Sequence, residues 1–292
     1  MSLESKLNKN RFFNGKTSTQ SKRWLFIVPF ILLSFVLVFI PLIMIVVKTF
    51  SPTSDGPMSE NWTIIDLFIW QKIIVSLVIA IVVTIVCIII AYPFAYFLAS
   101  QKSKLYKALV ISLVTTPIWT SFLVKLIGLK TFFDVMYGVD NSTYGNIYTI
   151  IGLVYLYVPF MIMPIYSVLI DMPNNLINAS HDLGHSGTST FFKIVVPYTK
   201  TALISGITLV FLPTITTVAV PQFLNNANNG TLIGDIIVDE GQQGLTSDIA
   251  LARASTLSLV LCGVLIGGYV LFRVSYSRIS RHFKKQKVKA YA

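Results

Sequence analysis

Asn-Ala-Ser-His-Asp-Leu-Gly at residues 178–184, followed by Ile-Val-Val-Pro at residues 194–197, is the stretch that says most about this chain. It is polar, it is broken by Gly184, and it lies between two long apolar runs. A membrane-spanning helix needs about 20 mostly apolar residues, and both flanking runs reach this length. We therefore expect the stretch to be an exposed segment that joins two spans of a membrane protein.

The composition of the whole chain also indicates a membrane protein. Hydrophobic residues make up 54% of the 292 residues and charged residues only 12%, whereas soluble domains carry about 25% charged residues. Largely apolar runs occur at about 24–47, 73–99, 108–124, 147–170, 201–220 and 254–272. The sequence lacks the period-two alternation of a membrane barrel, and helices satisfy their own backbone hydrogen bonds in lipid. The sequence thus predicts an all-α integral membrane protein with six transmembrane helices.

The distribution of charge predicts the orientation of these spans. Basic residues cluster in segment 1–23 and at the end of the chain, and the loop 100–107 carries three lysines without an acid. The loops that would lie on the other side carry acids, among them Asp134 and Asp140. Because Lys- and Arg-rich loops stay in the cytoplasm, both termini and residues 171–200 are predicted to be cytoplasmic. This topology, with attraction to anionic membrane lipid, accounts for the net charge of +11 without a nucleic-acid partner.

The segment after the fourth apolar run has the pattern of a short amphipathic helix. Pro173 suits the first turn of a helix, where its missing N–H is not needed. Leu176, Ala179 and Leu183 recur at helical spacing and form one apolar stripe. Gly184 stands where a glycine closes a helix. An interfacial helix that lies on the membrane could show the same pattern.

A second short helix is expected after the glycine. Residues 186–190 offer several N-caps, and Pro197 is expected to stop the segment before the fifth span. The result would be a helix–glycine–helix elbow. His181 and His185 are spaced i, i+4, but no third ligand is nearby, so we expect surface histidines and no metal site.

The spacing of this loop resembles the E-A-A-x3-G-x9-I-x-L-P signature of the permease subunits of bacterial ABC importers. Asn178 stands where that signature has Glu, and Ser180 stands where it has Ala. The resemblance implies that the loop docks into a separate ATPase subunit. The residues that would make this contact are Leu176, Asn178, Ala179, Ser180, Asp182, Leu183, Gly184, Ile194 and Pro197.

Further strings resemble the first permease subunit of spermidine/putrescine ABC importers. They lie at residues 92–99, 117–125, 153–166, 211–213, 220–221 and 232–235, and Lys125 stands where this branch has Arg. The resemblance implies the fold of a type I ABC importer permease, in the plasma membrane of a bacterium. It divides the chain into a basic tail (1–23), a first transmembrane helix (24–48), a permease core (70–275) with a coupling loop (172–198), and a basic tail (276–292).

The same resemblance implies several partners. They are a second permease subunit that completes a heterodimer, a pair of ATPase subunits, and an external substrate-binding protein or lipoprotein. No P-loop of the form G-x-x-x-x-G-K-[ST] occurs in the sequence. We therefore expect this chain to bind no cofactor, with ATP and Mg²⁺ held by the partner ATPase subunits. No catalytic residues are assigned, because no nucleophile–base or metal constellation is found.

The acidic and aromatic residues of the predicted spans limit what the protein can transport and how. No acidic residue falls at the middle of a predicted span, which counts against a proton-coupled carrier. A secondary transporter or channel that works without an ATPase is the alternative function. Residues that could contact a cationic polyamine along the passage are Trp119, Lys125, Tyr155, Tyr157 and Tyr166, although the aromatic rings could equally serve packing and interfacial anchoring. Prolines expected to interrupt or kink the helices are Pro93, Pro117, Pro159, Pro164 and Pro213.

Overall fold

The computed structural model describes residues 3–54, 56–137, 145–225 and 232–290, and the side chains of 27–54, 56–137, 145–173, 175–225 and 232–270. The basic side chains of the two tails, and Asp140, lie outside this description, so the charge-based orientation stays a prediction. The chain divides into two units. Unit 1 comprises Met1–Ile64 and Gln243–Ala292, and unit 2 comprises Ile65–Gln242.

The described chain is helical, apart from an isolated bridge between Thr53 and Gly56. Helices long and apolar enough to cross a membrane are the stretch Ile27–Phe50 of α1 (Leu3–Phe50), α2 (Leu67–Ser100), α5 (Gly145–Ile170) and the stretch Asp248–Val270 of α12 (Asp248–Ala290). Two bent pairs raise these 4 spans to 6 if each pair is one span. The prediction of an all-α membrane protein is confirmed, and six spans is the upper end of this range.

The core of unit 2 consists of α2, α5 and α9 (Lys200–Ile215), each of which packs against the other two. Small residues recur along the buried face of α2, namely Ser76, Ala80, Thr84, Cys87, Ala91 and Ala95. On α9, a Cβ atom added at Gly206 would lie 2.6 Å from the sulfur of Met161 on α5. Small side chains at these positions let helix backbones approach closely, which is the main source of packing between helices in a membrane.

The predicted third span is not one continuous helix. α3 (Lys104–Trp119) ends inside the apolar run, and α4 (Phe122–Tyr137) begins after a bend of 95°. Thr120 is extended, and its hydroxyl donates to the Pro117 carbonyl oxygen at 2.9 Å. The Lys125 ammonium group donates to the same oxygen at 2.7 Å. Because side chains satisfy this carbonyl, the helix can stop within an apolar run.

The predicted fifth span also ends early. α9 ends at Ile215, and a separate short helix, α10 (Ala219–Leu224), follows. The Thr214 and Thr216 hydroxyls donate to the carbonyls of Val210 and Leu212, near the end of α9, at 2.6 Å and 3.2 Å. The other prolines do not break their helices: Pro93 lies inside α2, and Pro159 and Pro164 lie inside α5.

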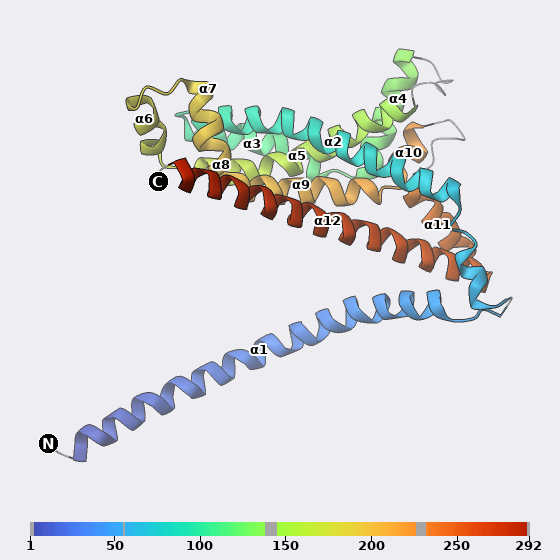
Figure 1. Ribbon diagram of the computed structural model, residues 1–292, viewed down its shortest axis with the longest axis horizontal. Coiled ribbons are helices and arrows are strands. Elements are labelled where there is room, and N and C mark those ends of the chain that lie inside the picture. The colour runs from blue at the N-terminus through green and yellow to red at the C-terminus, as the bar shows by residue number, and fades with distance from the viewer. Residues whose placement is uncertain (1–2, 55, 138–144, 226–231, 291–292) are drawn as a thin grey trace. The chain divides into compact units, whose positions relative to one another are not determined.

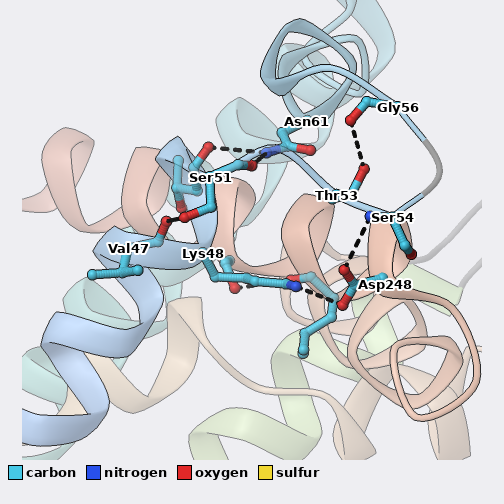
Figure 2. A network of polar contacts seen from close by, with 11 residues as sticks. Val47, Lys48, Ser51, Thr53, Ser54, Gly56, Asn61 and Asp248 are labelled. Carbon is cyan, nitrogen blue, oxygen red and sulfur yellow. Dashed lines mark hydrogen bonds and ion pairs between the residues drawn. The ribbon is translucent and has the colours of Figure 1, made fainter.

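In unit 1, polar contacts connect the end of α1 to the start of α12 (Figure 2). The Lys48 ammonium group lies 2.5 Å from Oδ1 of Asp248, the first residue of α12. The backbone N–H of Ser54 donates to the other oxygen of that carboxylate at 3.4 Å. After α1, the buried Asn61 of η1 (Met58–Trp62) donates from Nδ2 to the carbonyls of Thr49 and Ser51. These contacts hold the α1–η1 connection against the first turn of α12.

Candidate functional site

The segment between α5 and α9 forms the predicted elbow. Its first helix is α6 (Asn174–Asp182), with Pro173 as its N-cap residue. The second arm consists of α7 (Gly187–Thr190), the π-helical turn η2 (Phe191–Val195) and α8 (Val196–Tyr198). Within unit 2, α6 and α7 lie at the end opposite α4 and α10 (Figure 1). A compact elbow thus projects from one end of the helix core.

Gly184 ends α6 in the manner that the sequence predicts. Its φ is 78°, a left-handed conformation that L side chains rarely adopt. The N–H of Gly184 donates to the carbonyl of His181 at 2.8 Å, and the N–H of His185 donates to the carbonyl of Ser180 at 3.1 Å. These two bonds form a Schellman motif. Ser186 then caps α7 by accepting from the N–H of Ser189, so the glycine turns the chain directly from one helix into the next.

The predicted apolar stripe of α6 is exposed. Leu176 and Ala179 are exposed, and Leu183, just past the helix end, is 79% exposed. Asn178 and Asp182 are exposed beside them. The outer face of α6 thus exposes leucines beside a glycine turn. Such a face offers a partner a shallow apolar surface.

Ser180 does not belong to this outer face, contrary to the prediction. It is only 2% exposed and lies on the inner side of α6, with the half-buried Ile177 packed against the core. Ser180 follows Ile177 by three residues, so the two side chains lie close together on the side of α6 that packs against the rest of unit 2. Ile194 is likewise half-buried and packs on the core, whereas Pro197 is exposed.

Pro197 was expected to stop the second arm, but the arm continues past it to Tyr198. The proline lies in the first turn of α8, where no N–H is required of it. The chain bends one residue after α8, at Thr199, and the arm Gly187–Tyr198 makes an angle of 71° with Lys200–Ile215.

The aromatic residues proposed for the passage are not gathered into one site. Trp119 is 88% exposed at the end of α3, and Lys125 binds the Pro117 carbonyl at the α3–α4 break. Tyr155 and Tyr157 are two residues apart on α5, so they point about 200° apart around the helix. Tyr155 is exposed and Tyr166 is buried. The passage residues therefore stay a prediction, and the geometry places Lys125 at a helix end.

Asp235 is a buried acid that sequence reasoning missed. It is 2% exposed and lies in the first turn of α11 (Ile233–Gln243), in the segment predicted to be a loop between spans five and six. Its Oδ2 accepts from the N–H of Leu232 at 3.1 Å, and the next N–H, of Ile233, donates to the Ser76 hydroxyl on α2 at 3.0 Å. In the described part of the chain Oδ1 has no well-formed hydrogen bond. The helix start is thus capped by one local and one tertiary acceptor.

The surroundings of Asp235 raise its pKa from 3.8 to about 6. Burial is the main cause, because it disfavours the ionised carboxylate. The N–H of Leu232 opposes this rise, the negative charge of Asp239 adds to it, and Gln222 and Lys72 lower the pKa. No local sequence pattern marks this burial, because it depends on the packing of α11 against a helix that is remote in the chain.

Comparison with known proteins shows the class of protein to which this chain belongs. Residues 91–285 match the family described as binding-protein-dependent transport system inner membrane component, and the chain belongs to this family. It is a permease subunit of an ABC importer, embedded in the cell membrane. The alternative of a carrier or channel that works without an ATPase is therefore set aside.

Individual relatives within this family are also similar to the chain. The chain is 42% identical over 244 residues to the spermidine/putrescine transport system permease protein PotB homolog of Mycoplasma pneumoniae, covering 80% of this chain and 85% of that protein. It is 38% identical over 283 residues to the homolog of the same name in Mycoplasma genitalium, covering 93% and 99%. Its fold is similar to a chain of a bacterial ABC transporter involved in the import of the acidic polysaccharide alginate, with a TM-score of 0.64 at 14% identity, covering 86% and 96%.

Proposed function

We propose that this chain is a permease of an ATP-driven importer of polyamines, and that the exposed face of α6 docks onto a separate ATPase subunit. The other members of the assembly are a second permease, a pair of ATPase subunits and an external substrate-binding protein or lipoprotein. Polyamine as the cargo is supported by the names of the two mycoplasmal relatives. Docking is supported by the elbow itself.

The observation that carries the docking proposal is the outer face of α6. Leu183, which is 79% exposed, directly precedes the glycine turn, and Leu176 is exposed two turns earlier. Burying an exposed leucine contributes about 1.5–3 kcal/mol, so a partner that covers this face is bound partly by the burial of Leu176 and Leu183. The Schellman turn keeps the surface in one conformation, which lowers the entropic cost of docking. With Asn178 in place of Glu, apolar contact carries more of the binding than charge does.

The test of docking is Leu183→Asp in the full chain, expressed with the candidate ATPase and second permease. Removing an apolar anchor from an interface and placing a charge there costs several kcal/mol when the residue is a hot spot. We expect loss of ATPase co-purification and at least a tenfold fall in ATP-dependent uptake into vesicles. The matched control is Leu245→Asp, because Leu245 is also highly exposed (88%) but lies in the turn after α11.

Normal ATPase association by the Leu183 variant would refute docking through this face. Cargo is tested separately, with vesicles that contain the whole assembly and labelled spermidine, putrescine and a set of uncharged and anionic solutes. We expect accumulation of a polyamine when ATP is supplied and none when it is withheld. Accumulation of a different solute class would refute the cargo assignment and leave docking intact.

A further inference from the structure

The inner side of the elbow holds a buried pair of hydroxyl groups. The Ser180 and Thr190 hydroxyl oxygens lie 2.8 Å apart, and the two residues are 2% and 1% exposed. Ser180 is in the last turns of α6, and Thr190 is the last residue of α7. Each hydroxyl is deeply buried, so breaking the pair would leave a polar group without a partner, which costs about 1–3 kcal/mol. The hydroxyl pair therefore holds α6 and α7 together.

The residue after this pair reaches a helix that is remote in sequence. The Phe191 ring packs edge-on against Tyr92 and Tyr96 of α2, with centroids 5.2 Å and 5.3 Å away. Tyr92 and Tyr96 are one turn apart, so the ring rests across one face of α2 near its end at Ser100. Edge-to-face pairs of this kind contribute about 0.5–1.5 kcal/mol each beyond the area that they bury.

A second contact fixes the far end of the same arm. The Tyr92 hydroxyl forms a hydrogen bond with the Thr199 hydroxyl, at the bend between α8 and α9. Thr199 is completely buried, and its hydroxyl also donates to the Val195 carbonyl at 3.0 Å. α2 is thus held at both ends of the arm that contains η2. The π-helical turn of η2 is a rare local geometry that tends to occur at functional positions.

We propose that Ser180, Thr190 and Phe191 are positioning residues that transmit displacement of α6 to the end of α2. α5 and α9 are joined to the elbow through the backbone, whereas the elbow contacts α2 directly through side chains, those of Phe191 with Tyr92 and Tyr96 and of Thr199 with Tyr92. Since packed side chains with discrete arrangements transmit displacement better than mobile ones, the hydroxyl pair and the Phe191 ring suit this role. The inference rests on the proposed docking of α6 onto an ATPase.

The test follows a fluorescent label on α2 in the assembled complex. The label is attached at Phe97→Cys, an exposed position of α2, in a background where the exposed Cys262 is replaced by Ser and the buried Cys87 is retained. In the otherwise unchanged chain we expect the label to respond when ATP is added. With Phe191→Ala we expect the response to fall about five- to tenfold, a typical size for an energetic coupling between two sites. ATP hydrolysis and association with the ATPase should stay at the level of the unchanged chain.

Phe192→Ala is the matched control, because Phe192 is the neighbouring ring but is exposed. Thr190→Val removes only one hydroxyl and serves as the second variant in case Phe191→Ala fails to accumulate. We expect it to reduce the response about threefold, with a matching fall in labelled spermidine taken up per ATP hydrolysed.

The outcomes separate the two proposals. If no ATPase assembles with the unchanged chain, docking fails, and this inference fails with it. Suppose that the ATPase assembles but the label on α2 does not respond to ATP, or responds as strongly in the Phe191 and Thr190 variants as in the unchanged chain. Transmission to α2 is then refuted and docking stands. A merely structural role would lower assembly, hydrolysis and response together, and that result also refutes transmission.

Discussion

Asp235 is the residue whose chemistry is most altered by its place in the fold. Its pKa of about 6 lies above the ordinary value of 3.8, because burial disfavours the charged form. The folded chain therefore holds this proton more tightly than the unfolded chain. Stability from this group falls as the pH rises from about 4 to about 6, and the whole penalty, at most about 3 kcal/mol, is present at neutral pH.

Asp235→Asn should remove this pH dependence. The amide is neutral, and its oxygen can still accept from the N–H of Leu232. At pH 7.5 we expect a higher apparent melting temperature than in the unchanged chain, measured by tryptophan fluorescence in detergent, and the gain should shrink towards zero near pH 4. Asp239→Asn, at an exposed position, should keep most of the dependence. A gain that is equal at both pH values would contradict the assignment.

At the scale of elements, α11 contains two glycines, of which one is required by close packing and the other is not. A Cβ atom at Gly234 would lie 2.7 Å from the backbone oxygen of Thr217 and 3.0 Å from that of Thr216. Backbone cannot move aside as a flexible side chain can, so this glycine is required by close approach. Around Gly241, in the same helix, nothing lies within 4 Å of such an atom.

The two glycine-to-alanine variants should therefore have opposite effects. Gly234→Ala forces the start of α11 away from the end of α9, and overpacking of this kind costs about 1–3 kcal/mol. Gly241→Ala restricts the unfolded chain at no steric cost and should stabilise by about 0.5–1 kcal/mol. Melting temperatures of the two variants, taken beside the unchanged chain, check this. Shifts in the same direction would show that the close contact at Gly234 is relieved easily.

Sequence reasoning about elements succeeded where the signal was local and failed where it was not. The glycine break and the caps of the elbow depend on residues within a few positions of one another, and both were predicted. An interruption at Pro117 was predicted, and α3 ends two residues later. The bend of 95° was not predicted, because the apolar run 108–124 has no polar interruption long enough to signal it. The structure ends α3 there because Lys125 and Thr120 return to the Pro117 carbonyl.

At the scale of the whole molecule, the side of the membrane that each connection faces decides which partners can reach it. Basic loops predict that the elbow is cytoplasmic and that the turn after α11 is external. Thr188 on α7 and Leu245 in that turn are both exposed, so each can carry a reporter. The orientation determines whether an ATPase can reach the elbow at all.

Single-cysteine labelling tests this topology. In a chain with Cys262→Ser, a membrane-impermeant maleimide applied to intact cells should label Leu245→Cys at once. It should label Thr188→Cys only after the membrane is made permeable. Labelling of Thr188→Cys from outside intact cells would invert the topology and would exclude docking of a cytoplasmic ATPase on α6.

The sequence by itself determined that this is a polytopic helical membrane protein with a glycine-broken elbow between two apolar runs. Those features follow from hydrophobicity, charge and cap residues, which act over a few neighbouring positions. The tertiary structure decided that Ser180 faces inward, that Phe191 rests on α2, and that Asp235 is buried in a helix start whose Ile233 N–H reaches Ser76. These contacts join residues of different helices. Their energies depend on which helices pack together, and no local pattern contains that information.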